Sequence, residues 1–210
     1  MSKPKYEHLL PHQEKFINYT QTECYNKKGF LLFHFMGTGK TGTALGWSMN
    51  YKNIDTVIIV PKGLELTWKN EKQNFGIRKK TKIITFPQFW KNPNKFKKDI
   101  KNKILIIDEA QRICKFFNKT KDANIKSEII RIFFSSHATL LLSGTPIMYG
   151  PTDLSILVNI AARKNVLPYD KTTFIKKYGI LDKKKANRLK KLSNEVNSYG
   201  RVYKAMATSA

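Results

Sequence analysis

Five residues near the N-terminus have the types and the spacing of a phosphate-binding loop: Gly37, Thr38, Gly39, Lys40 and Thr41. Glycines let the backbone curl so that successive N–H groups face phosphate oxygens, and the start of a following helix adds its dipole. The lysine of such a loop reaches the β- and γ-phosphates, and the hydroxyl of the next residue ligates Mg²⁺. His34 replaces a glycine of the full pattern, so a glycine turn beside a surface lysine is the alternative. We expect ATP and Mg²⁺ to bind here.

Two adjacent carboxylates, Asp108 and Glu109, follow the apolar run 104–107. An aspartate at the end of a buried strand beside a phosphate loop can hold Mg²⁺ through water, and the adjacent glutamate can orient and deprotonate the attacking water. An acidic turn that closes a strand is the alternative interpretation. We favour the catalytic one because the chain has only 15 acidic residues against 39 basic ones.

A third apolar run, 140–142, ends in a small hydroxylated turn, Ser143-Gly144-Thr145-Pro146. On its own this turn indicates little. The order along the chain is specific: a phosphate loop, then an Asp-Glu pair, then Ser-Gly-Thr-Pro, each directly after an apolar run. An unrelated phosphate-loop kinase would not need the second and third motifs.

In this order the motifs resemble the first RecA-like lobe of superfamily two helicases and translocases. More narrowly, the chain is similar to the Swi/Snf-type double-stranded DNA translocases and their relatives in poxviruses and other large DNA viruses. The resemblance extends over about residues 9–178. The site residues that it implies are Lys40, Glu109 and Gln111 for catalysis, Gln13 and the loop Gly37 to Thr41 for the nucleotide, Thr41 and Asp108 for Mg²⁺, and Ser143 and Thr145 for coupling nucleotide state to DNA grip.

Two features depart from the family pattern. The Asp-Glu-Ala-His or Asp-Glu-Ala-Asp box ends here in Gln111, which can form hydrogen bonds but cannot titrate. The family's second RecA-like lobe carries an arginine finger, and only 65 residues follow Thr145, too few for another lobe of about 100–150 residues. We therefore expect half a motor, or a partner chain that supplies the second lobe, with the transcription machinery as a further candidate partner.

The chain has a net charge of +24, and the charge is concentrated in two segments. Residues 62–103 hold 13 basic and 3 acidic residues, and residues 163–191 hold 11 and 2. Such segments bind polyanions, and lysines, which outnumber arginines by 33 to 6, contact phosphates rather than bases. An AT-rich genome with merely solvated lysines is the alternative. The contacts to duplex DNA that we expect, from the family's DNA-side segments, are Lys62, Lys79, Lys80, Lys82 and Thr85.

Apolar runs alternate with helical patterns along most of the chain, which predicts an α/β fold: a parallel, RecA-like sheet with helices on both faces. We expect one lobe over residues 1–162 and a basic helical appendage over 163–210, with two helices from Lys171 on and a frayed tail from 201. Residues 87–102 are expected to be a surface segment, where Phe86, Phe89 and Trp90 either pack beneath it or stack on bases. The expected strands are 29–34, 56–60, 82–86, 103–107 and 138–142, and the expected helices are 11–25, 41–50, 64–74 and 124–134.

Composition limits the remaining possibilities. No apolar run reaches 18 residues and the N-terminus lacks a signal-peptide pattern, so we expect an intracellular protein of the cytoplasm, viral factory, virion or nucleus, with no membrane span. Cys24 and Cys114 fit a reducing compartment and small core positions, and no cysteine or histidine cluster indicates zinc.

The sequence thus predicts the ATP-binding motor lobe of a DNA-dependent, helicase-like ATPase, active when completed by a second lobe. One alternative is a nucleotide- and nucleic-acid-binding subunit or truncated fragment that hydrolyses little by itself. Another is a relic retained for its basic surface, which the intact Lys40, Asp108 and Glu109 argue against.

Overall fold

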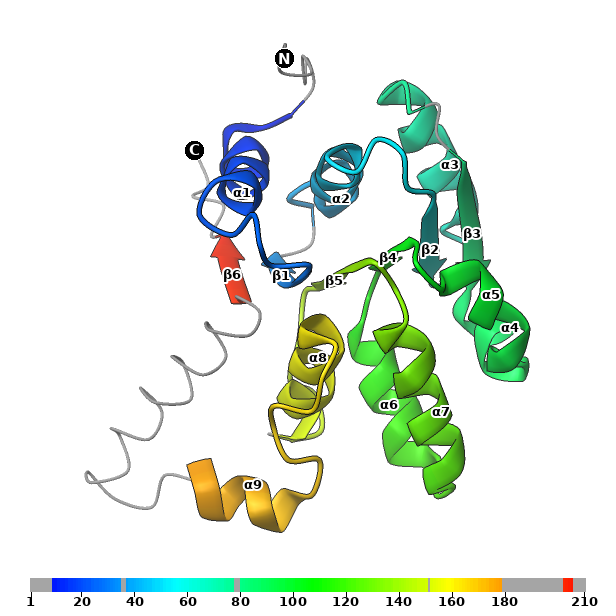
Figure 1. Ribbon diagram of the computed structural model, residues 1–210, viewed down its shortest axis with the longest axis vertical. Helices are drawn as coiled ribbons and strands as arrows, with labels where there is room; N and C mark the ends of the chain where they lie inside the picture. Colours follow the sequence, from blue (N-terminus) through cyan, green and yellow to red (C-terminus); the bar gives the residue numbers. More distant parts are fainter. Residues whose placement is uncertain (1–8, 35–36, 78–79, 151, 179–201, 206–210) are drawn as a thin grey trace.

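The computed structural model describes residues 9–34, 37–77, 80–150, 152–178 and 202–205. Its described strands form a single sheet in the order β3-β2-β4-β5-β1-β6, and every neighbouring pair is parallel (Figure 1). The predicted parallel sheet is therefore confirmed. The strands are β1 (Gly29–His34), β2 (Thr56–Val60), β3 (Thr81–Thr85), β4 (Ile104–Ile107), β5 (Ala138–Ser143) and β6 (Val202–Ala205).

The central strands are apolar along their whole length because both faces of the sheet are covered. In the register of the sheet, Ile59, Ile107, Leu141 and Leu31 form one row across β2, β4, β5 and β1. All four side chains belong to one core cluster. Ile58, Ile106 and Leu140, each one position earlier in the chain, belong to a second cluster on the opposite face. The two-residue period of a strand thus divides the core into two layers.

Helices cover both faces of the sheet (Figure 1). On one face, Phe16, Trp47 and Trp68 join the second core cluster, one from each of three helices. On the other face, the helices that follow β3, β4 and β5 contribute to the first cluster. The first group is α1 (Pro11–Gln21), α2 (Lys40–Met49) and α3 (Glu65–Asn74); the second is α4 (Phe86–Lys91), α5 (Lys97–Ile100), α6 (Gln111–Lys119), α7 (Ala123–Phe134) and α8 (Thr152–Ala162).

The segment expected to lie on the surface, 87–102, is folded into α4, a 3-10 helix (Pro93–Phe96) and α5. Its lysines and asparagines face outward, but Phe89, Phe96 and Ile100 are buried in the first core cluster. Phe89 stacks on Phe133 with 5.2 Å between the ring centroids. The packing interpretation of the aromatic residues is therefore confirmed for Phe89, and the segment lies at the surface as expected, with helices that the sequence analysis did not predict.

The C-terminal region differs from the expected frayed tail. Strand β6 adds to the sheet beside β1, with Val202 opposite Leu31. An open strand edge presents unpaired N–H and C=O groups, and β6 pairs with those of β1 through its backbone. Helix α9 (Lys171–Tyr178) is the first of the two basic helices expected, and its Phe174 packs with Val158 of α8. The second expected helix lies outside the described residues.

Two predictions from composition can be compared with the fold. Cys24 and Cys114 are both buried free thiols, as expected for small core residues. Over the described ranges, no helix combines the length and the apolar character needed to span a membrane.

Candidate active site

The phosphate loop joins the end of β1 to the start of α2, so the predicted strand, loop and helix are confirmed. Gly37 and Gly39 have φ angles of 80° and 72°, in the left-handed region that favours glycine. A Cβ on Gly39 would also lie 2.3 Å from Nε2 of Gln13. Lys40 is the first residue of α2, and no side chain of the described residues caps this helix. The N–H groups of its first turn are therefore directed towards the loop, as an anion site requires.

Helix α1 is attached to this loop by two side chains. Gln13 donates from Nε2 to the carbonyl oxygen of Gly39 over 2.7 Å, and its Oε1 accepts the N–H of Leu10 over 2.7 Å. Nε2 of His12 donates to the carbonyl oxygen of Thr38 over 3.0 Å. Gln13 is only 3% exposed. Its amide holds the loop in the described conformation, and the reading of adenine by Gln13 stays a prediction.

His34 occupies the end of β1, where the full loop pattern has glycine, and its side chain is fully buried. Within the described part of the chain, neither ring nitrogen has a hydrogen-bond partner, and the ring meets that of His12 edge-on at 5.5 Å between centroids. Burial lowers the pKa of His34 to about 4, helped by the nearby His12 and Lys40. A neutral imidazole therefore packs in the core at the start of the phosphate loop.

The carboxylates stand at the end of β4. The N–H of Asp108 still bonds to the carbonyl oxygen of Ile59 in β2, and Glu109 then turns the chain with a φ of 49°. Asp108 is 6% exposed, and burial raises the pKa of its carboxyl group. Oδ2 of Asp108 accepts the indole N–H of Trp68 over 3.1 Å, and Oδ1 accepts the N–H of Glu109 over 2.9 Å. The bond from Trp68 favours the charged carboxylate, so it lowers this pKa and opposes the effect of burial.

A chain of side-chain contacts joins the three sequence motifs. Nζ of Lys40 lies 3.4 Å from Oε1 of Glu109. Nε2 of Gln111 donates to the other oxygen of Glu109 over 2.5 Å, and Oε1 of Gln111 accepts the hydroxyl of Ser143 over 2.8 Å. Oγ of Ser143 in turn accepts the N–H of Thr145 over 3.1 Å. The structure thus brings together the residues predicted for catalysis and for coupling.

The donor atoms at this site suit Mg²⁺. Thr41 offers a hydroxyl at the second position of α2, and Asp108 offers a carboxylate at the end of β4. The described residues contain no group of three or more metal-binding side chains. Mg²⁺ is usually held by one or two protein oxygens together with substrate phosphates, and Thr41 and Asp108 offer oxygens of this kind. The residues therefore fit a metal that arrives with a nucleotide.

Two residues of the site were missed as functional candidates. Trp68 lies in α3, and its bond to Asp108 depends on how this helix packs against the end of β4. Asp153 of α8 is 1% exposed, and its Oδ2 accepts the N–H groups of Met148 and Tyr149 over 2.9 and 2.7 Å. In the sequence, Asp153 follows the Ser-Gly-Thr-Pro turn as in the Swi/Snf-type pattern, but the resemblance did not assign it this role. Asp153 holds the loop that follows Ser143.

The described residues predicted to contact nucleic acid are divided between two edges of the sheet: Lys62 and Thr85 lie at the carboxyl ends of neighbouring strands, and Lys80 and Lys82 lie at the other edge. Lys62 is exposed just after β2, at the carboxyl edge of the sheet. Lys80 and Lys82 lie at the opposite end of β3, and Nζ of Lys82 pairs with Asp99 over 2.6 Å. Thr85 is 5% exposed and caps α4, because its hydroxyl accepts the N–H of Gln88. Lys79 lies outside the described residues.

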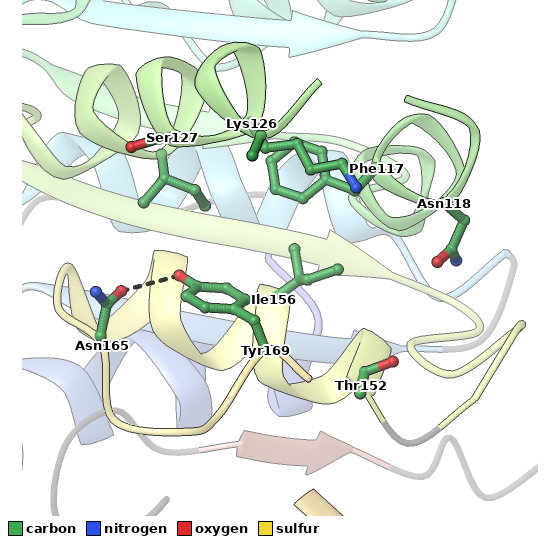
Figure 2. Close-up of a pocket in the computed structure, with 10 residues that line it drawn as sticks. Phe117, Asn118, Lys126, Ser127, Thr152, Ile156, Asn165 and Tyr169 are labelled. Carbon is green, nitrogen blue, oxygen red and sulfur yellow. Dashed lines mark hydrogen bonds between the residues drawn. The ribbon is translucent and has the colours of Figure 1, made fainter. Parts of the chain in front are cut away.

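A separate hollow of about 400 Å³ opens between α6, α7 and α8 (Figure 2). Phe117 and Ile156 form part of its apolar wall, and the hydroxyl of Tyr169 donates to Oδ1 of Asn165 over 3.0 Å at its rim. None of the predicted site residues lines this hollow.

The sequence-family model of the SNF2-related domain matches residues 69–199 of this chain. The chain belongs to this family. Two viral proteins have similar sequences. The chain is 28% identical over 170 residues to a putative ATP-dependent RNA helicase, L538, of Acanthamoeba polyphaga mimivirus, covering 79% of this chain and 35% of the relative. It is also 28% identical over 200 residues to a putative helicase, 087L, of Invertebrate iridescent virus 3. That match covers 74% of this chain and 20% of the relative.

Among solved structures, the SNF2-related chain resembles a Sulfolobus solfataricus SWI2/SNF2 ATPase core determined in complex with double-stranded DNA. The TM-score is 0.71 at 19% identity, and the match covers 93% of this chain and 44% of the other. This likeness shows the shared fold and confirms the predicted RecA-like architecture. The chain spans about a third or less of the two viral relatives described above.

Proposed function

We propose that this SNF2-related chain is the ATP-binding motor lobe of a DNA-dependent ATPase, and that it hydrolyses ATP with Mg²⁺ when a second RecA-like lobe completes the site. The observation that carries the proposal is the chain of contacts from Lys40 through Glu109 and Gln111 to Ser143. Structural turns at the ends of three strands would not require these side chains to bond to one another. A nucleotide-driven motor needs such bonds, because they link the phosphate loop to the Ser-Gly-Thr-Pro turn.

The residues divide the chemistry between them. The loop Gly37 to Thr41 and the start of α2 bind the phosphates, and Lys40 neutralises their charge. Lys40 now pairs with Glu109 at 3.4 Å, so a triphosphate that attracts Lys40 leaves Glu109 free to accept a proton from water. Thr41 and Asp108 would hold Mg²⁺, which supplies positive charge at the β- and γ-phosphates.

An exposed apolar loop supports the presence of a facing second lobe. Ile147, Met148 and Tyr149 are consecutive, each is 53% exposed, and they follow Ser143 at the carboxyl edge of the sheet. Contiguous exposed apolar side chains of this kind mark interaction surfaces. We infer that a second RecA-like lobe, in the same polypeptide or in a partner chain, packs against this loop.

The nucleic acid that we propose is duplex DNA. The net charge of +24 and the predominance of lysine support binding to a phosphate backbone without base readout. The SWI2/SNF2 core with a similar fold was determined on double-stranded DNA, whereas the mimivirus relative carries the name of an RNA helicase. Duplex RNA is therefore the competitor that an experiment must include.

The deciding experiment measures ATP binding and hydrolysis by the purified chain, alone and with duplex DNA, duplex RNA or single strands. Lys40→Ala should lose about 1.5–3 kcal/mol of ATP affinity, because a charge-assisted phosphate contact is removed, while the fold survives. Glu109→Gln should keep nucleotide affinity and abolish turnover. Unchanged ATP binding by Lys40→Ala would contradict the phosphate-loop assignment.

In this proposal the second lobe supplies an arginine finger, and such a finger accelerates phosphoryl transfer by roughly 10³–10⁵-fold, so we expect slow turnover from these 210 residues by themselves. Addition of the second lobe should restore DNA-stimulated hydrolysis. Nucleotide and DNA binding without any hydrolysis, even with that lobe present, would favour the alternative of a binding subunit.

A further inference from the structure

We propose that Trp68 is a positioning residue for the carboxylate of Asp108 and, through it, for the Mg²⁺ of the bound nucleotide. The inference rests on the proposed function and adds to it a residue from a different part of the chain. Trp68 and Asp108 are 40 positions apart, and the helix α3 that carries Trp68 contains none of the predicted site residues.

The contact fixes both oxygens of one carboxylate. The indole N–H of Trp68 reaches Oδ2 of Asp108 over 3.1 Å, and the N–H of Glu109 reaches Oδ1 over 2.9 Å. Rotation of the carboxylate would break both bonds. Each oxygen keeps a further lone pair, so waters bound to a metal ion can still be accepted. Donors of this kind orient metal ligands, and their loss typically lowers metal affinity or activity by about 10–100-fold.

Burial by itself does not explain the direction of the indole. Trp47 of α2 is as deeply buried as Trp68, at 0% and 1% exposure, and belongs to the same core cluster. Among the residues that the structure describes, the indole nitrogen of Trp47 finds no hydrogen-bond partner. The core of this face therefore accepts a tryptophan whose N–H is unused, whereas the N–H of Trp68 is directed at the one carboxylate that the site needs for metal.

The two tryptophans provide a matched test. Trp68→Phe and Trp47→Phe each remove an indole N–H and part of a buried ring, but only the first removes a bond to Asp108. We would measure the binding of fluorescent ADP in EDTA and across a Mg²⁺ titration, and Mn²⁺ binding to the protein–ADP complex by electron paramagnetic resonance. Trp68→Phe should keep the affinity for ADP in EDTA and raise the metal concentration for half-saturation by about 10–100-fold. Trp47→Phe should leave that concentration unchanged.

A double variant separates positioning from packing. If Trp68 acts through Asp108, then Trp68→Phe should add almost nothing to the loss of metal affinity in Asp108→Asn, whereas an independent packing defect should add fully. Thermal unfolding of all variants records the packing contribution separately.

A measurement on the unaltered chain covers the case in which Trp68→Phe does not fold. The indole N–H signals of the tryptophans are assigned by nuclear magnetic resonance with Trp47→Phe and Trp90→Phe, and Mg²⁺ is added to the ADP complex. The Trp68 signal should shift and the Trp47 signal should not. Equal metal dependence of the two single variants, or an unmoved Trp68 signal, overturns the inference. Failure of the unaltered chain to bind ADP at all would instead refute the proposed function.

Discussion

The hydroxyl of Ser143 donates a 2.8 Å hydrogen bond to Oε1 of Gln111, which joins two motifs that are 32 positions apart in the sequence. The amide of Gln111 simultaneously donates to Glu109. An amide can do both because it carries an acceptor and a donor on one planar group. The departure from the family's Asp-Glu-Ala-His or Asp-Glu-Ala-Asp box therefore leaves a physical link between the proposed general base and the Ser-Gly-Thr-Pro turn.

Gln111→Glu should damage hydrolysis more than nucleotide binding. The substitution keeps an acceptor for Ser143 but replaces the donor to Glu109 with a second negative charge, which raises the pKa of the carboxyl pair. A base held protonated loses about tenfold in rate for each pH unit by which the pKa exceeds the assay pH. The measurement is kcat against pH in the presence of the second lobe. Gln111→His restores the family's box and serves as the control that should keep its rate; identical pH profiles for both variants would contradict this role.

Lys62 should contribute to DNA binding more than Lys82. Lys62 is exposed at the carboxyl edge of the sheet, where ligands of open parallel sheets collect, whereas Lys82 is paired with Asp99 near the opposite edge. Lys62→Gln should reduce the slope of log affinity against log salt by about 0.9, and Lys82→Gln should change it less. Fluorescence anisotropy with duplex DNA over a salt series measures both slopes.

The alternative location for DNA binding is the C-terminal basic segment. Lys183, Lys184 and Lys185 lie outside the described residues, and their joint replacement by glutamine tests that segment. If this triple variant no longer binds DNA while Lys62→Gln binds it normally, the nucleic-acid surface lies on the C-terminal segment.

His34 should make folding stability sensitive to mild acid. In the unfolded chain this histidine takes up a proton near its ordinary pKa of 6.5, but in the folded chain only near 4. The unfolded state therefore binds more protons between these values, and stability falls as the pH is lowered through this window. The full effect is up to about 3 kcal/mol. Urea unfolding of the unaltered chain and of His34→Phe from pH 7.5 to pH 4 measures it. A constant difference between the two proteins across this range would refute the prediction.

Asp153→Ala should destabilise the chain and loosen the loop after Ser143. The carboxylate is buried and accepts two backbone N–H groups, from Met148 and Tyr149, and the loss of such bonds costs about 1–3 kcal/mol. Asp153→Asn should cost less, because the amide oxygen can accept the same two bonds. Chemical denaturation ranks the two variants. Equal stability of both would mean that the loop does not depend on these bonds.

The sequence by itself determined the strands and the motifs that follow them. A strand covered on both faces must be apolar throughout, and this local property is visible in the runs that became β1, β2, β4 and β5. Phosphate loops and acidic pairs are likewise read from neighbouring residues. The helices α4 and α5 were not predicted, since the many lysines and asparagines of this surface segment obscure the few side chains, such as Phe96, that anchor it in the core.

Only the tertiary structure decided which motifs touch. Strand β4 lies between β2 and β5, so the residues after β4 have the helix that follows β2 on one side and the turn that follows β5 on the other. Asp108 therefore meets Trp68, and Gln111 meets Ser143. These pairs depend on strand order, which is set by the packing of the whole core rather than by any local pattern of residues.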